Sequence, residues 1–540
     1  MPEINRRQLI KTGLTVSAAA VAGTTALSAC SNKGRGGVTA QSSTKVKLPK
    51  FVRYNGVKPD YVGTNGVQDA AIAYPANPVK AATSKPGDGK PVSALVMTNS
   101  PAPPALKNNK YWQTLNKRMG FDFQIELVPF GDWSQRFQTA VAGDKLPDVF
   151  ALLTGSIASL PNLLEQKAVD LTPHLSGDAV TKYPFLANIP TESWNLTTYG
   201  GKIFGVPIPR GAQSSGILYG RQDLLSQQGI NERPNTLADF QALCQQLTAK
   251  QANHWALGRA PLGWVRQAHG IANSWSLQNG KLVSALEDER QKDALEATRQ
   301  LVAKKVVHPD AFTAQNSDWK TWMANGTIWL VDDTFSAMPG FYLYPSIKSF
   351  RLLYWGPPSV NGGDASIWLG NPNYSMTAIN ANSADRIEAL LSVLNYLAAP
   401  FGTEEYRFKH YGVEGVDYKL KGTDPVMTQQ GTSETQLSLS YLAEGPWVTY
   451  QPGHAQATKD AFEAQSRLVP KGIANPVLGL YSDTDIRKGA QIGLGDLEND
   501  ILQGRQPVSK WDAGVAEWKR KGGDKIRDEY QKALDERNGK

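Results

Sequence analysis

The residues that could do chemistry in this sequence do not form a recognisable catalytic motif. No two histidines have the spacing of a zinc site, and the serines of GAQSSG at 211–216 lack the spacing of a nucleophile elbow. No glycine-rich phosphate loop is present. The six histidines are scattered: His174, His254, His269, His308, His410 and His454. None of these patterns predicts a catalytic centre.

Asp332 and Asp333 are the carboxylate pair that invites an enzymatic reading, because two carboxylates can serve as acid and nucleophile in a glycosidase. Adjacent residues on a strand point to opposite faces, so these two alone cannot flank one bond. A turn or capping role is the favoured reading. A surface-anchored polysaccharide-degrading enzyme stays open as an alternative.

The chain has only two cysteines, Cys30 and Cys244. In the segment 236–247, Leu237, Phe240 and Cys244 share one helical face, which predicts a buried, inert thiol. Cys30 follows a leader with a basic head, which includes Arg6 and Arg7, and an apolar run too short to span a bilayer.

The leader resembles two export signals. NRRQLIK, with Arg6 and Arg7, resembles the twin-arginine signal, and Leu27-Ser28-Ala29-Cys30 resembles the lipobox of bacterial lipoproteins. This implies a signal peptide at 1–29, a diacylglycerol anchor on Cys30, and a location at the outer face of the cytoplasmic membrane. Ordinary signal cleavage is the alternative. The polar residues after Cys30 predict a flexible tether.

Composition excludes other classes of partner. Without residues 1–29 the chain keeps 511 of its 540 residues, which suits two lobes rather than one core. The net charge of +8 is spread along the chain without basic blocks, so we expect no nucleic-acid partner.

Strand and helix patterns alternate from residue 91 onward. Strands are expected at 91–100, at 121–130 and from 149, with helices at 110–120 and 132–143 between them. In the second helix, Asp132 is expected to cap the start and Gly143 to take the left-handed position at the end. This rhythm predicts an α/β fold with mostly parallel strands.

From residue 91 to the C-terminus the chain resembles bacterial extracellular solute-binding proteins of family 1, the large oligosaccharide-binding lipoproteins of ABC importers. The segments that carry the resemblance are AVAGDKLPDVF, YGGKIFGVPIPR, the helix pair from LYGRQDLL, YGVEGVDYKL and the closing LENDILQGRQPVSKW. The resemblance implies a periplasmic-binding-protein-like fold, in which two α/β lobes with crossing hinge strands enclose a ligand cleft.

The implied division has six parts. Residues 30–90 are an anchored tether and extension, 91–207 and 346–400 form lobe 1, and 208–345 and 401–540 form lobe 2 with the closing helices. Related proteins carry an acidic calcium loop after the helix at 236–249, whereas TAKQANHWALG here has no acidic residue. We therefore expect neither calcium there nor any cofactor.

Fourteen Trp and nineteen Tyr suit a sugar, whose C–H faces stack on aromatic rings. Position in loops selects the candidate ligand residues, with Asn99 placed at the carboxyl end of the first strand and Asp333 after the strand GTIWL. The full set is Asn99, Trp264, Trp275, Asp333, Trp368 and Trp447. The expected partners are an oligosaccharide and ABC permease subunits, and we expect a monomer. The alternatives are a peptide or other organic solute, or a sensor or adhesin without a permease.

Overall fold

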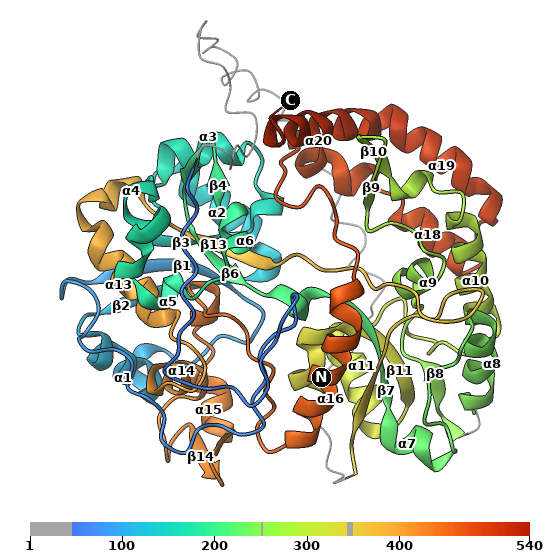
Figure 1. Ribbon diagram of the computed structural model, residues 1–540, viewed down its shortest axis with the longest axis horizontal. Helices are drawn as coiled ribbons and strands as arrows, with labels where there is room; N and C mark the ends of the chain where they lie inside the picture. The colour runs from blue at the N-terminus through green and yellow to red at the C-terminus, as the bar shows by residue number, and fades with distance from the viewer. Residues whose placement is uncertain (1–45, 250–251, 343–348, 540) are drawn as a thin grey trace, which may run out of the picture. The chain divides into compact units, whose positions relative to one another are not determined.

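The computed structural model describes residues 46–249, 252–342 and 349–539, all of which belong to one compact unit. Two sheets divide this unit into two α/β lobes, which Figure 1 shows as two groups of elements. The predicted leader and anchor residues Arg6, Arg7 and Cys30 lie outside the described residues.

Lobe 1 is built on a five-stranded sheet with the order β2-β1-β3-β13-β6. β2 and β3 both pair parallel to β1, which confirms the three predicted parallel strands. The other two strands are antiparallel to their neighbours. The strands are β1 Val92–Thr98, β2 Phe123–Pro129, β3 Val149–Leu152, β6 Val206–Pro209 and β13 Asn373–Ile379.

Local sequence explains the first helix of lobe 1. The side chain of Asn109 accepts a hydrogen bond from the backbone N–H of Trp112 at 2.8 Å, and Gly120 ends the helix at φ 83°. The helices of this lobe are α1 Lys110–Met119, α2 Trp133–Ala142, α3 Leu160–Lys167, α4 Thr172–Leu175, α5 Pro184–Ala187, α6 Thr191–Asn195, α13 Ile387–Leu397, α14 Glu404–Tyr411 and α15 Gln429–Glu434.

The second helix, α2, has the predicted extent but different ends. The Asp132 side chain makes no capping hydrogen bond, because the residue is already inside a short 3-10 turn. Gly143 has φ −84°, and the left-handed residue is Asp144 at φ 52°, one position later. The predicted cap and terminator are therefore wrong.

Lobe 2 is built on a four-stranded sheet with the order β12-β7-β11-β8. β7 is antiparallel to both neighbours, and β8 is parallel to β11. The strands are β7 Gly216–Arg221, β8 Trp255–Leu257, β11 Ile328–Thr334 and β12 Leu352–Trp355. Its first helices are α7 Gln222–Gln227, α8 Leu237–Leu247, α9 Leu262–Ala268, α10 Gln291–Ala303, α11 Asn316–Asn325 and α12 Met338–Phe341.

Helix α8 confirms the predicted buried cysteine. Thr236 and Asp239 form a reciprocal capping box, and Cys244 is fully buried on the apolar face, where burial raises the pKa of its thiol. An inert packing role follows, since the reactive thiolate is disfavoured.

The remaining helices are α16 Ala455–Leu468, α17 Ala490–Ile492, α18 Gly495–Leu502, α19 Trp511–Trp518 and α20 Asp524–Arg537. Three two-stranded hairpins complete the fold: β4 Thr198–Tyr199 with β5 Lys202–Ile203, β9 Trp275–Gln278 with β10 Lys281–Ser284, and β14 Tyr418–Lys421 with β15 Asp424–Met427. α20 packs on β10 and α18 packs on α10, so these closing helices extend lobe 2.

The boundaries between the lobes fall at other residues than those expected from the sequence. β12 lies within 346–400, yet its apolar run LLYW hydrogen-bonds to β7 in lobe 2. Phe408, Leu437 and Leu442 lie within 401–540, yet they are buried in the same core as β1. The chain therefore returns to lobe 1 only after β12 and stays there until about residue 443.

Residues 46–90 pack as an ordered extension, and the predicted tether up to residue 45 lies outside the described residues. The backbone N–H of Val52 donates to Ala187 O at 2.8 Å, and that of Ala71 donates to Thr449 O at 3.1 Å. Tyr61 stacks on Phe462 of α16, with 5.1 Å between ring centroids. The extension thus contacts lobe 1 and also the helix that packs on β12 of lobe 2.

Candidate functional site

The strand topology places the carboxyl-end edge of each sheet next to the segments that cross between the lobes. The chain leaves lobe 1 after β6, enters β7 at Gly216, and returns between β12 and β13. β1 and β3 end at the edge where β13 begins, and β11 ends beside the start of β7. The loops after these strands therefore lie at the junction of the lobes, where open α/β sheets bind ligands.

A cavity of about 370 Å³ lies at this junction. Lobe 1 contributes Thr154 after β3 and the start of β13, and lobe 2 contributes Asn475, Tyr481 and Tyr530 from its closing segment. The lining is rich in amide, hydroxyl and phenol groups, which are the partners that a polyhydroxylated solute needs.

Two buried oxygens in this cavity have no hydrogen-bond partner among the described residues. They are Asn373 Oδ1 and Ser375 Oγ, on side chains that are 6% and 3% exposed. The amide nitrogen of Asn373 donates to Ser193 O at 2.8 Å, which fixes the direction of its oxygen. An unpaired buried polar group costs about 1–3 kcal/mol, so both oxygens are suited to a ligand that donates hydrogen bonds.

The closing segment of lobe 2 is bonded to lobe 1 beside this cavity. Asp483 Oδ1 accepts from the backbone N–H of Ser159 at 3.1 Å and from the hydroxyl of Tyr481 at 2.9 Å. Burial, together with the neighbouring Asp483, raises the pKa of Tyr481 to about 12, so its hydroxyl keeps its proton at neutral pH.

An aromatic stack adjoins the cavity at Tyr374, which also lines it. Tyr374 and Tyr441 are stacked with 4.8 Å between centroids, and the guanidinium of Arg210 lies 4.4 Å from the Tyr374 ring centroid. Asn99 Nδ2 lies 3.4 Å from the hydroxyl oxygens of both tyrosines. The predicted residue Asn99 thus lies at the carboxyl-end edge of the five-stranded sheet of lobe 1, in a polar and aromatic cluster.

Asp333 lies at the facing edge of lobe 2. Its carboxylate accepts from the backbone N–H of Thr334 at 2.7 Å and from Trp319 Nε1 at 3.4 Å. Burial raises the pKa of the neighbouring Asp332, and Arg259, 3.7 Å away, opposes that rise. The two carboxyl groups of the pair therefore have different surroundings.

The tryptophans predicted to bind a ligand are dispersed. Trp264 is 2% exposed in the lobe 2 core against Phe240, and Trp275 packs with Trp518 and Tyr530. Trp368 is half-buried and donates from Nε1 to Ile271 O at 2.9 Å. Helix and hairpin packing occupies these rings, so none of the three lines either cavity described in this section.

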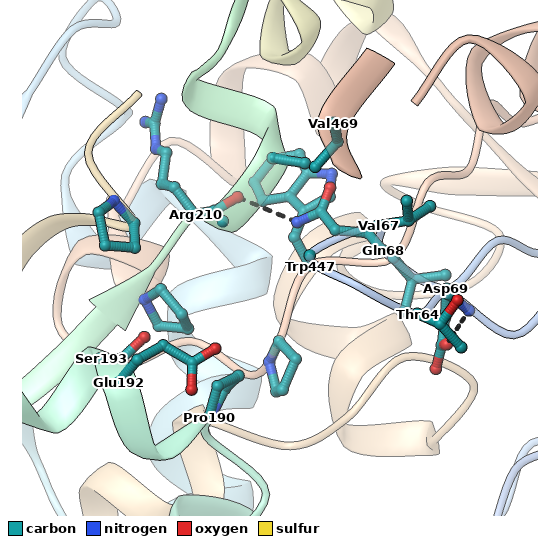
Figure 2. A pocket seen from close by; sticks show the side chains of 18 of the residues that line it. Thr64, Val67, Gln68, Asp69, Pro190, Glu192, Ser193, Arg210, Trp447 and Val469 are labelled. Carbon is teal, nitrogen blue, oxygen red and sulfur yellow. Dashed lines mark hydrogen bonds between the residues drawn. The ribbon is translucent and has the colours of Figure 1, made fainter. Parts of the chain in front are cut away.

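Trp447 lines a second and larger cavity of about 650 Å³ (Figure 2). This cavity lies between the crossing segments and the extension, and no loop that follows β1, β2 or β3 contributes to it. The smaller cavity is favoured as the solute site, because it includes the loop after β3 and holds the unpaired oxygens of Asn373 and Ser375.

Sequence reasoning missed Arg210, Tyr374, Tyr441 and Tyr481. Arg210 ends the segment YGGKIFGVPIPR that carries the resemblance, so position could have found it, whereas Tyr374 lies at the start of β13. Tyr441 and Tyr481 reach the junction from distant parts of the chain, and no local pattern marks them.

Comparisons with known proteins give relatives by sequence and by fold. Residues 110–341 match the family described as bacterial extracellular solute-binding protein. Lipoprotein LipO of Bacillus subtilis is 22% identical over 481 residues, which cover 83% of this chain and 93% of LipO. The polygalacturonan/rhamnogalacturonan-binding protein YtcQ of the same species is 20% identical, covering 78% of this chain and 87% of YtcQ.

Solved structures share the fold. The N-glycan transport solute-binding protein NgtS of Streptococcus pneumoniae has a TM-score of 0.61 at 16% identity, covering 84% of this chain and 100% of that one. An HMO-binding, ABC-transporter-associated protein of Bifidobacterium longum infantis has 0.59 at 15%, covering 83% and 99%.

These structures define the fold class, which is the periplasmic-binding-protein-like fold with two α/β lobes. The family match over residues 110–341 agrees with the resemblance stated from the sequence. Within the described residues no helix is long and apolar enough to cross a membrane. The same residues contain no group of three metal-ligating side chains.

Proposed function

We propose that this protein captures an oligosaccharide between its lobes and delivers it, chemically unchanged, to the permease of an ABC importer. The two unpaired oxygens of Asn373 and Ser375 in the junction cavity carry the proposal, because sugar hydroxyls can donate to both. Tyr374 lines the same cavity, so its phenol side chain can contact the same solute.

The relatives support the choice of solute. YtcQ is named for binding polygalacturonan and rhamnogalacturonan, and FusA of Streptococcus pneumoniae, at a TM-score of 0.58, is described in complex with kestose. The proposal includes export through the Arg6-Arg7 leader and anchoring through Cys30 at the outer face of the cytoplasmic membrane.

A thermal-shift and calorimetry panel tests the function. The probes are kestose, maltotetraose, cellotetraose, lacto-N-tetraose and oligogalacturonides, with tetrapeptides as the competing class. An oligosaccharide should raise the melting temperature, since a ligand of the folded state stabilises it. Tyr374→Ala should raise the Kd at least tenfold, and Trp112→Ala, a half-buried aromatic change on α1, should leave it unchanged.

Two outcomes would overturn the proposal. Binding of peptides without any oligosaccharide would assign the other solute class. Release of shortened sugars during incubation would establish the enzymatic alternative.

A further inference from the structure

The 650 Å³ cavity shares Leu478 with the junction cavity, and its other lining residues are different. The crossing segments around Arg210 and Gly370 form one side, and residues 51–69 of the extension form another. Val469 and Leu478 from the lobe 2 side close it. Its volume lies in the range of about 300–1,000 Å³ that is typical of small-molecule sites.

The lining suits an uncharged ring. Trp447 and six prolines supply rigid apolar surface; the prolines are Pro59, Pro190, Pro209, Pro372, Pro400 and Pro446. The charged lining residues balance, because there are two arginines and two carboxylates, and Arg53 is paired with Asp69. A flat apolar surface with few charges matches the C–H face of a sugar ring.

Two acceptor side chains of the lining have an oxygen without a hydrogen bond or ion pair among the described residues. Gln68 Nε2 donates to Arg210 O at 3.0 Å, and its Oε1 is buried without a partner among the described residues. The carboxylate of Glu192 is exposed and makes no ion pair with any described residue. Figure 2 shows Gln68 beside Trp447, with Glu192 below them in the view.

We propose that this cavity is a second carbohydrate-binding site, in which a neutral sugar ring packs on Trp447 and donates hydroxyl hydrogen bonds to Gln68 and Glu192. The inference rests on the proposed function for the class of ligand. It goes beyond that function because the extension, rather than the loops at the junction, completes the site.

Calorimetry on the full mature chain tests the second site with kestose, maltotetraose, cellotetraose and lacto-N-tetraose as probes. We expect two sites per chain for at least one probe. Trp447→Ala should weaken one of them at least tenfold, and Glu192→Gln should weaken the same one about fivefold. Tyr374→Ala should weaken only the other, and Glu165→Gln, an exposed carboxylate change on α3, should alter neither.

The outcomes separate the two proposals. A single site that Tyr374→Ala removes and Trp447→Ala leaves intact overturns the second site and keeps the function. A single site that depends on Trp447 and not on Tyr374 overturns the junction as the solute site. Should Trp447→Ala not fold, Glu192→Gln decides alone, because that side chain is exposed and has no ion pair with any described residue. No binding of any probe overturns both.

Discussion

Ser375 shows at the scale of one residue how ligand binding and folding can compete. Its hydroxyl is buried at 3% exposure with no partner among the described residues, so the ligand-free fold carries the cost of an unmet hydrogen bond. A solute hydroxyl in the junction cavity would remove that cost.

Ser375→Ala should therefore have opposite effects on folding and on binding. We expect the free energy of unfolding of the ligand-free protein to rise by about 1 kcal/mol, measured by urea titration. The Kd for the solute should rise about fivefold, the equivalent of one hydrogen bond.

Ser383→Ala is the matched control, because this buried hydroxyl already donates to Asp148 Oδ1 at 2.8 Å. It should lower stability by about 1 kcal/mol and leave the Kd unchanged. Equal stability losses in both variants would contradict a ligand role for Ser375.

At the residue scale, the sequence predicts a position correctly where one strand decides it, while the ligand role of Asn99 stays a prediction. Asn99 lies at the carboxyl-end edge of the lobe 1 sheet because it follows β1 directly. Trp264 follows Gly and Pro residues that suggest a loop. It lies instead in the first turn of α9, and its ring packs on Phe240. The unpaired oxygens of Asn373 and Ser375 could not be predicted, because absence of a partner depends on the whole fold.

At the scale of elements, the closing segment acts as a bridge between the lobes. Asp483 accepts from Ser159 on lobe 1 and also pairs with Arg487 of its own segment. Burial alone would raise the pKa of Asp483, and hydrogen bonds from Arg487, Tyr481 and Ser159 outweigh it, so the pKa is lowered.

Asp483→Ala should loosen this bridge. Loss of the contact with Ser159 should speed solute dissociation about fivefold, with little change in association, when followed by stopped-flow fluorescence. The control is Asp500→Ala, which removes an ion pair with Arg505 inside lobe 2 and should leave the dissociation rate unchanged. Identical rates in all three proteins would show that the bridge does not hold the lobes together.

Elements were predictable from sequence to the extent that their signals are local. Helix α8 forms as expected because its signals lie within one segment. These signals are the capping box of Thr236 and Asp239 and the apolar face with Cys244. β12 was assigned to the wrong lobe because its apolar run shows that a strand is buried but not which strand it pairs with. That choice is made by β7, more than a hundred residues earlier.

At the scale of the whole molecule, buried and half-buried histidines link stability to pH. Desolvation is the main cause that lowers the pKa of the buried His308 and of the half-buried His269 and His410 below the ordinary value of 6.5. Lys409 lowers that of His410 further, and Glu444 opposes both effects. These histidines are spread over both lobes, so the effect belongs to the fold rather than to one site.

The sign of the pH dependence follows from proton binding. Below pH 6.5 the unfolded chain binds protons that the folded chain refuses, so stability should fall as the pH drops from 7.5 to 5. Each histidine protonated only in the unfolded chain contributes up to about 1.4 kcal/mol per pH unit. Melting temperatures across this range should therefore decrease, and His410→Gln should make the decrease shallower. A melting temperature that rises on acidification would contradict the burial of these rings, whereas an unchanged slope in His410→Gln would exclude only His410 as a contributor.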